Sequence, residues 1–182
     1  RYMLLLAFPL ALGTTLLSER IIQLVYGADY ISSAVALSLL IWTTLFVFIG
    51  LINAAALIAS GQQRFLAKLS LGLLVINAIL NFFLIPEYGF IGASFASMLA
   101  QGIGVVIGSY IIYKNTGSNP FKKIEGMIGA TLLMGLFIYF FHINLALAIM
   151  ISILIYILFI FLFKVVDSRD IERFKNTLKK NQ

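Results

Sequence analysis

Long, uninterrupted apolar runs dominate the chain and restrict the folds open to it. A helix needs about 20 apolar residues to cross the hydrocarbon core of a bilayer, and six segments have or approach that length. They are roughly Tyr2–Tyr26, Ser33–Ala59, Leu66–Ile85, Phe90–Tyr113, Ile124–Phe141 and Leu145–Phe163. The runs do not alternate between polar and apolar residues, as the strands of a transmembrane β-barrel would. The sequence therefore predicts an all-α integral membrane protein with six transmembrane helices.

The composition agrees with a membrane protein. Of the 182 residues, 62% are hydrophobic and 11% are charged, and the mean hydropathy is +1.05. Soluble domains are about 45–50% apolar and about 25% charged, so a soluble fold could not bury this much apolar surface. The chain begins with Arg1, and we expect it to be a piece of a longer protein.

The basic residues gather at alternate links between the apolar segments. Twelve of the 13 Lys and Arg residues lie at residue 1, in or beside the links after the second and fourth segments, or after the sixth. The other links carry no basic residue, and two of them carry Asp29 and Glu87. Because Lys and Arg concentrate in cytoplasmic loops, both ends of the chain are expected in the cytoplasm. The net charge of +6 then reflects membrane orientation, and we expect no nucleic-acid partner.

The last part of the sequence, residues 166–182, is polar and basic. Ile171, Phe174 and Leu178 would fall on one face of a helix there, with Arg and Lys around them. This pattern predicts an amphipathic helix on the anionic cytoplasmic leaflet, and a frayed, solvated tail is the alternative.

Small residues recur at every fourth position of the fourth segment, at Gly92, Ala96, Ala100, Gly104 and Gly108. Positions with this spacing share one helix face, and small residues there let a neighbouring span approach closely. The stripe therefore predicts a packing face within one subunit, with a sliding or dimer face as the alternative.

Two features of the first segment bear on function. Glu19 and Arg20 are ionisable residues inside a span, where a charge is costly and a functional role is the default hypothesis. Arg20 either extends to the headgroups as part of an interfacial pair, or lines a central cavity. In a cavity it could bind a phosphate beside a carboxylate able to take a proton. Pro9 and Gly13 interrupt the same segment and predict a static kink or a hinge.

Amide side chains form the second group of candidates. Asn77 and Asn81 lie one helical turn apart in the third segment, while Asn53 lies in the second and Gln101 in the fourth. A buried amide needs hydrogen-bond partners, so these side chains either bridge to a neighbouring helix or face a hydrated path. On such a path Asn77 and Asn81 would contact sugar hydroxyls. Together with the charged pair of the first segment, these two residues are the candidate substrate-path residues.

The sequence lacks the residues of familiar catalytic and metal sites. It contains no cysteine and a single histidine, His142, which excludes thiol catalysis, cysteine metal sites and histidine clusters within the chain. It contains no serine-histidine-acid set, no paired carboxylates in a polar loop and no phosphate-cradling glycine loop. We therefore expect no catalytic residue, no metal, no cofactor and no enzymatic activity.

Three short motifs carry a family resemblance. Residues 24–30, Leu-Val-Tyr-Gly-Ala-Asp-Tyr, look like the "leucine, aromatic, glycine, two residues, tyrosine" turn of polysaccharide-biosynthesis membrane proteins. Residues 59–62, Ala-Ser-Gly-Gln, resemble their "alanine, x, glycine" helix exit. Residues 81–97 are similar to their segment with asparagine, then isoleucine-proline, x, tyrosine-glycine and glycine-alanine. These proteins are oligosaccharide flippases of the multidrug, oligosaccharidyl-lipid and polysaccharide exporter superfamily, and the resemblance covers roughly residues 1–115.

The resemblance implies two six-helix lobes around a central cavity, followed by two added helices. By this analogy residues 1–115 are the last four helices of the second lobe of a fourteen-helix transporter. Residues 116–165 would then be the two added helices, and residues 166–182 a cytoplasmic tail. The family typically holds a pyrophosphate with several cationic residues in the cavity, whereas here only Arg20 lies inside a span.

The function implied by the resemblance is transport. A lipid-linked oligosaccharide on a polyprenyl-pyrophosphate carrier would cross a prokaryotic plasma membrane by alternating access of the two lobes. The implied partners are membrane lipid, the lipid-linked glycan and other polysaccharide-assembly membrane proteins.

Two other functions compete with this interpretation. A multidrug or cation exporter of the same superfamily would need an embedded acid on a cavity face, for which Glu19 is the candidate. A membrane glycan polymerase or lipid-linked glycosyltransferase would need a sizeable polar outer loop, and the outer links here are only a few residues long. The motifs favour the flippase.

Overall fold

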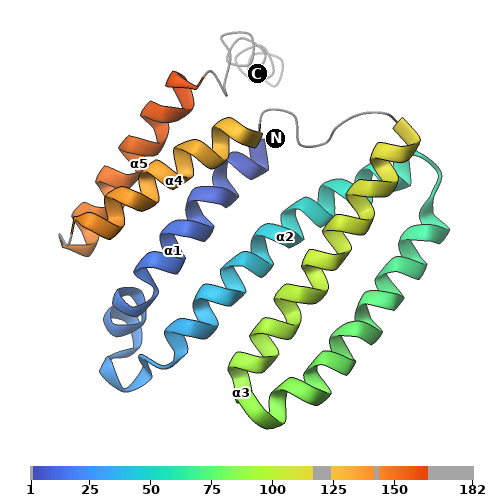
Figure 1. Cartoon of the computed structure of the whole chain (residues 1–182), viewed down its shortest axis with the longest axis horizontal. Coiled ribbons are helices and arrows are strands. Elements are labelled where there is room, and N and C mark those ends of the chain that lie inside the picture. Colours follow the sequence, from blue (N-terminus) through green and yellow to red (C-terminus); the bar gives the residue numbers. More distant parts are fainter. Residues whose placement is uncertain (1, 117–123, 142–143, 164–182) are drawn as a thin grey trace, which may run out of the picture. The chain divides into compact units, whose positions relative to one another are not determined.

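The computed structural model describes residues 2–116, 124–141 and 144–163, and all regular structure in these ranges is helical (Figure 1). The helices are α1 (Tyr2–Tyr26), the short 3₁₀ helix η1 (Ala28–Tyr30), α2 (Ser33–Ala59), α3 (Gln63–Thr116), α4 (Ile124–Phe140) and α5 (Leu145–Leu162). The expected all-α class is confirmed. The predicted tail over residues 166–182 lies outside the described residues, as do residues 117–123 of the fourth link and His142 of the fifth.

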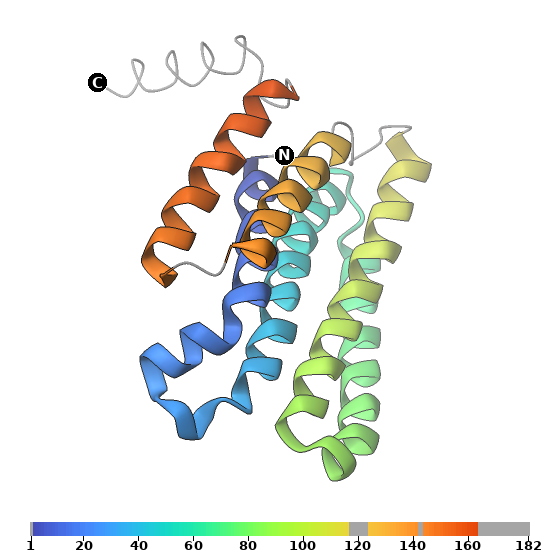
Figure 2. The same ribbon diagram turned by 60° about the vertical axis from the view of Figure 1, so that its left-hand side comes forward.

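The chain divides into two compact units, Arg1–Phe121 and Lys122–Gln182. In the first unit, α2 packs against α1 on one side and against α3 on the other. Figures 1 and 2 show the same order, with α2 between α1 and α3. The second unit consists of α4 packed against α5.

Helix α1 continues through Pro9 and Gly13, and its C-terminal part turns away from the direction of its first turns (Figure 2). Two hydroxyls hydrogen-bond to carbonyls of the preceding turn, Thr15 Oγ1 to Ala11 O at 2.7 Å and Ser18 Oγ to Thr15 O at 3.0 Å. Such bonds to the preceding turn tend to bend helices. The bend in α1 therefore has a local cause in addition to proline.

Helix α2 ends in a glycine cap. Gly61 has a φ of 72°, and its N–H donates to Ile58 O at 3.0 Å, while the N–H of Gln62 donates to Leu57 O at 2.8 Å. This pair of bonds is the Schellman motif, which satisfies the last carbonyls of a helix and favours glycine at the left-handed position. The chain then starts α3 at Gln63.

Helix α3 folds back on itself at Gly89, which is its non-helical residue, with φ 56° and ψ −134°. A first arm (residues 63–88) and a second arm (residues 90–116) run side by side in opposite directions (Figures 1 and 2). The sequence predicted a helix that stops at Ile85 and a short proline-glycine link over residues 86–89. A turn is present there, but it is shorter than predicted, because Pro86 is accommodated within the helix and Gly89 is the non-helical residue. Neighbouring groups can tolerate a proline in a membrane helix, whereas a positive φ is open mainly to glycine.

The small-residue stripe of the second arm is buried, as expected for a packing face. Ala96 has no exposed surface, and Ala100 and Gly108 are also buried. A Cβ atom added to Gly104 would lie 2.5 Å from Leu73 Cδ1 of the first arm. One added to Gly108 would lie 3.0 Å from Asn53 Nδ2 of α2, so the stripe packs against two helices at once.

The two helices of the second unit share a polar contact within an apolar interface. The side chains of Thr131 in α4 and Tyr156 in α5 are hydrogen-bonded, and Thr131 Oγ1 also donates to Met127 O at 2.7 Å. Helix α5 begins at Asn144, whose side chain accepts from the N–H of Ala146 at 3.1 Å. The contact between Thr131 and Tyr156 is of the kind that commonly joins helices in membranes.

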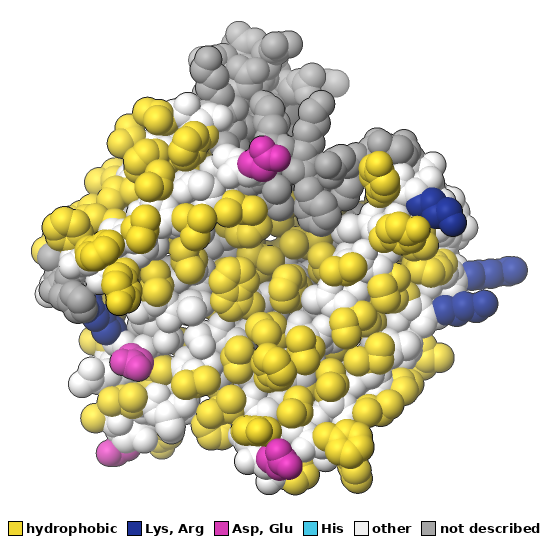
Figure 3. Space-filling view, viewed as in Figure 1, with side chains coloured by type: hydrophobic (Ala, Val, Ile, Leu, Met, Phe, Trp, Pro, Cys, Tyr) yellow, Lys and Arg dark blue, Asp and Glu magenta, His cyan; other side chains and the backbone are white. Residues whose placement is uncertain are grey.

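Four of the described helices are long and apolar enough to cross a membrane, namely Met3–Tyr26, Ser33–Ala59, Gln63–Asn115 and Leu145–Leu162, and α4 is apolar but shorter. Hydrophobic side chains cover much of the face in Figure 3, and Phe82 is 75% exposed. A soluble monomer rarely exposes large continuous apolar patches. The all-helical fold and this surface therefore indicate a membrane-embedded protein.

Candidate functional site

Charge is segregated between the two ends of the first unit. The bend at Gly89 and the link between α1 and α2 lie at one end, and the link between α2 and α3 lies at the other (Figures 1 and 2). Asp29 and Glu87 lie at the first end, and Arg64 lies at the second. All three side chains are exposed. Tyr26 and Tyr30 also lie at the acidic end, with ring centroids 6.1 Å apart, as is typical of side chains at a membrane–water interface.

The charged pair of α1 lies in the C-terminal part of that helix. Glu19 is exposed, and Arg20 is partly buried and engaged by another group. Both follow Ser18, whose hydroxyl takes part in the hydrogen bonds that accompany the bend. At a rise of about 1.5 Å per residue, they are roughly 10 Å from the end of α1. The pair thus lies inside the helix, toward the acidic end of the unit.

Asn77 and Asn81 contact each other on the first arm of α3. Asn81 Nδ2 donates to Asn77 Oδ1 at 2.9 Å, and both side chains are partly buried. Asn81 Oδ1 is buried and has no hydrogen-bond partner among the described residues. An unpaired buried acceptor is costly, so Asn81 retains an acceptor for a donor from elsewhere. The bridge to a neighbouring helix, one of the two expected alternatives, is not among the hydrogen bonds found for this pair.

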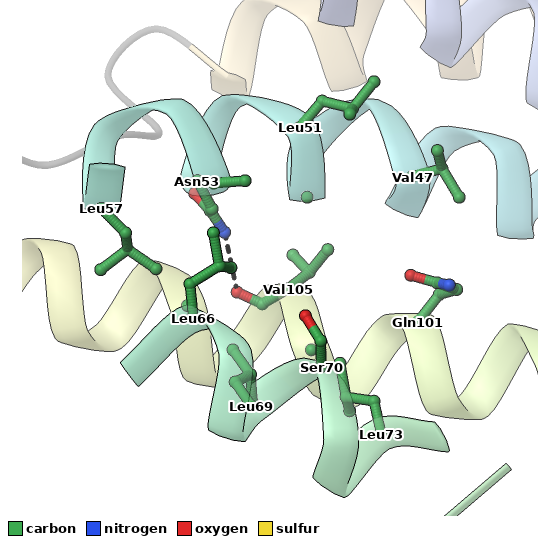
Figure 4. A pocket seen from close by; sticks show the side chains of 14 residues that line it. Val47, Leu51, Asn53, Leu57, Leu66, Leu69, Ser70, Leu73, Gln101 and Val105 are labelled. Atoms are coloured by element: carbon green, nitrogen blue, oxygen red, sulfur yellow. Dashed lines mark hydrogen bonds between the residues drawn. The ribbon is translucent and has the colours of Figure 1, made fainter. Parts of the chain in front are cut away.

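Asn53 bridges to a neighbouring helix, which is one of the two alternatives expected from the sequence. Its side chain is 4% exposed, and its Nδ2 donates to Ser109 Oγ at 3.0 Å and to Val105 O at 3.3 Å. Figure 4 shows Asn53 directed from α2 toward the second arm of α3, with its bond to Val105. Both protons of the amide are used in this way, which joins α2 to α3.

A cavity of about 210 Å³ lies next to this bridge, between α2 and the two arms of α3. Its polar groups come from three places in the chain, Asn53 on α2, Ser70 on the first arm and Gln101 on the second. Ser70 and Gln101 extend their polar ends toward α2 (Figure 4). Within the described part of the chain, neither of these two side chains has a hydrogen-bond partner. The remaining walls are apolar or glycine, and no charged side chain of the described residues lines the cavity.

The structure brings some of the candidate residues together and keeps others apart. Asn53 and Gln101 line the same cavity. The Asn77–Asn81 pair lies farther along the first arm, and the Glu19–Arg20 pair lies on α1, which α2 separates from α3. The candidate residues therefore occupy three separate places in the first unit.

Ser70 was not recognised from the sequence. Its position gives a usable signal, because Ser70, Asn77 and Asn81 are separated by seven and four residues. Residues with these separations share one helix face, so the first arm carries a polar stripe on the side that also bears Leu73, opposite Gly104. The cavity itself has no sequence signal, since it depends on how three helices lean against one another.

The comparisons with known proteins are limited but agree with each other. No protein-family model matches the chain, and no solved structure matches it. The chain is 32% identical over 98 residues, 54% of its length, to the capsular polysaccharide biosynthesis protein CapF of Staphylococcus aureus. It is 26% identical over 109 residues, 60% of its length, to the probable low-salt glycan biosynthesis flippase Agl15 of Haloferax volcanii.

These matches cover 24% of CapF and 23% of Agl15, so the chain spans about a quarter of the length of the curated relatives it matches. Both names concern the biosynthesis of a polysaccharide or glycan, and one of them names a flippase. The resemblance expected from the three motifs is confirmed: this all-helical, apolar chain is similar in sequence to polysaccharide-biosynthesis proteins of the flippase type.

Proposed function

We propose that the chain is part of a membrane flippase that moves a lipid-linked oligosaccharide across the plasma membrane for cell-surface polysaccharide biosynthesis. The similarity to a glycan flippase and to a capsular polysaccharide protein is the observation that carries the proposal. The long apolar helices provide the necessary setting. A flippase-type relative also favours a transporter over an enzyme.

The fold of the first unit is compatible with the architecture that we propose. Helices α1 and α2 and the two arms of α3 are four spans, with the links at Asp29 and Gly89 outside and the link at Gly61 in the cytoplasm. They correspond to the last four helices of the second lobe of a fourteen-helix transporter, and α4 and α5 are the two added helices. Alternating access of two lobes then carries the substrate across.

Each candidate residue has a distinct task in this proposal. Arg20 supplies a positive charge inside a span, where it binds the pyrophosphate of the polyprenyl carrier, because guanidinium and phosphate form strong charge-assisted hydrogen bonds. Asn77 and Asn81 offer hydrogen bonds to sugar hydroxyls, and the unpaired Oδ1 of Asn81 is an available acceptor. Glu19 next to Arg20 can take a proton. Glu19 is not among the residues that line the cavity between α2 and α3.

The direct test is deletion of the gene in its native prokaryote. Cytoplasm-facing lipid-linked glycan is expected to accumulate, and the full-length gene should restore export. Normal export in the deletion strain, combined with a new sensitivity to cationic drugs, would instead identify a multidrug exporter.

A variant of Arg20 tests the anion site. In the full-length protein, Arg20→Ala is expected to slow export by roughly tenfold or more, because a hydrogen bond to a charged group contributes about 1.5–3 kcal/mol. Arg20→Lys keeps the cation and should retain most of the export. The measurement is the rate of lipid-linked glycan export at equal protein level in the membrane. Equal export by Arg20→Ala and wild type would show that Arg20 is only an interfacial anchor.

A further inference from the structure

The cavity between α2 and α3 is polar at three points on otherwise apolar walls. Asn53, Ser70 and Gln101 come from three different helical stretches and line one space. Asn53 uses both amide protons on α3, which leaves its carbonyl oxygen as the group it can offer. Ser70 and Gln101 have no hydrogen-bond partner within the described ranges. In a membrane interior, unpaired polar groups favour a ligand or water that can pair with them.

The size and charge of the cavity narrow the choice of ligand. Its volume is about 210 Å³. Pockets for drug-sized ligands are larger, about 300–1,000 Å³, so the space fits one ring rather than an oligosaccharide. Among the residues that the structure describes, no Asp, Glu, Lys or Arg lines it, which favours an uncharged ligand.

We propose that this cavity binds one neutral, hydroxyl-bearing ring of sugar size. A sugar ring has apolar C–H faces and a rim of hydroxyls, which matches walls such as Val47 and Leu73 combined with the amides and the serine hydroxyl. The assignment of the ring to the transported glycan rests on the proposed function. The cavity and its chemistry do not.

A glycine of α2 leaves part of the space open. Gly50 lines the cavity, and a Cβ atom added to it would have no heavy atom within 4 Å. A larger side chain at Gly50 can therefore occupy the cavity without a clash at its Cβ. Gly72, on the first arm, is a matched control, since it also has open space around its Cβ and does not line the cavity.

The binding test uses the full-length protein in lipid nanodiscs with free D-glucose, D-galactose and N-acetyl-D-glucosamine as probes. Saturation-transfer NMR is expected to show binding of at least one of these sugars to wild type and to Gly72→Leu. Gly50→Leu, which fills the cavity, should abolish the signal. Absence of transfer to all three sugars with wild type, or equal transfer with Gly50→Leu, would overturn the proposal.

A second variant tests the site independently, in case Gly50→Leu fails to fold. Gln101 is exposed, so Gln101→Leu should leave the packing intact while it removes the amide that would hydrogen-bond to the sugar. We expect it to weaken sugar binding by about threefold to tenfold, the effect of one neutral hydrogen bond. Unchanged affinity in Gln101→Leu would contradict the assigned role of this amide.

An export assay separates this proposal from the proposed function. If the deletion strain exports its lipid-linked glycan normally, the flippase assignment fails, while sugar binding that is lost in Gly50→Leu still supports the site. If deletion blocks export but wild-type protein binds none of the three sugars, the cavity proposal fails and the flippase assignment stands.

Discussion

At the scale of single residues, the amides Asn53 and Asn81 show two different roles for the same side chain within apolar helices. Asn53 is a bridge from α2 to α3. The Nδ2 of Asn81 donates to Asn77, and its buried Oδ1 has no hydrogen-bond partner among the described residues. The sequence could name these amides but not separate the two roles, because both require the same residue type in the same kind of helix. Only the position of the neighbouring helix decides.

Asn53→Leu should destabilise the protein by about 1–2 kcal/mol, because it removes two inter-helix hydrogen bonds at a buried position. Ser109→Ala removes only one of those bonds and should cost less. Thermal unfolding of the full-length protein in detergent measures both effects. A melting temperature for Asn53→Leu equal to that of wild type would mean that the bridge contributes nothing to stability.

At the scale of secondary-structure elements, the sequence located the turn in α3 but placed its start too early. The helix was expected to stop at Ile85, but the first arm continues through Pro86 to residue 88. Gly89 makes the turn, because its φ of 56° is strained for other residues. The four-residue spacing of small residues did predict the packing face, although it could not name Leu73 or Asn53 as the groups that fill it.

The backbone at Gly89 predicts opposite outcomes for two glycine substitutions. Gly89→Ala should destabilise the protein by about 1–2 kcal/mol, because a side chain is strained at this positive φ. Gly72→Ala lies within the first arm, has open space around its Cβ, and should stabilise by about 0.5–1 kcal/mol. The two melting temperatures in detergent should lie on opposite sides of the wild-type value. Shifts in the same direction would contradict the role given to Gly89.

The contact between the arms can be tested at Gly104. Gly104→Leu should disrupt the packing of the arms, since an added Cβ alone would lie 2.5 Å from Leu73 Cδ1. Leu73→Ala in the same chain should restore part of the lost stability, because residues in contact are energetically coupled. Folded yield and melting temperature of the two single variants and the double variant complete the cycle. Strictly additive effects would show that the two residues do not meet.

At the scale of the whole molecule, the helical class and the alternation of charge were readable from the sequence. Long apolar runs leave few alternatives to helices, and the links of the first unit lie at the ends that alternation of spans requires (Figure 1). The cavity was not readable, because Asn53, Ser70 and Gln101 are far apart along the chain. Their convergence depends on the fold-back of α3 and on its packing against α2.

The proposed membrane orientation can be tested with single cysteines, since the chain contains none. In a full-length protein cleared of other cysteines, Asp29→Cys and Glu87→Cys should react with a membrane-impermeant thiol reagent in intact cells. Gln62→Cys should react only after the cells are permeabilised. Labelling in the reverse pattern would invert the orientation of the first unit.

The one-residue bend of α3 also bears on how the protein is made. A turn of this length is too short for one arm to span the bilayer while the other arm remains outside it. In the proposed orientation, with the bend on the outer side, the two arms would enter as a preformed hairpin, and the bend would pass through the hydrocarbon core with Glu87 beside Gly89. A charged side chain at the bilayer centre costs about 2.5–3.5 kcal/mol on insertion scales. In that orientation the paired apolar arms would offset this cost, and the bend at Gly89 would make membrane insertion of this region a single event.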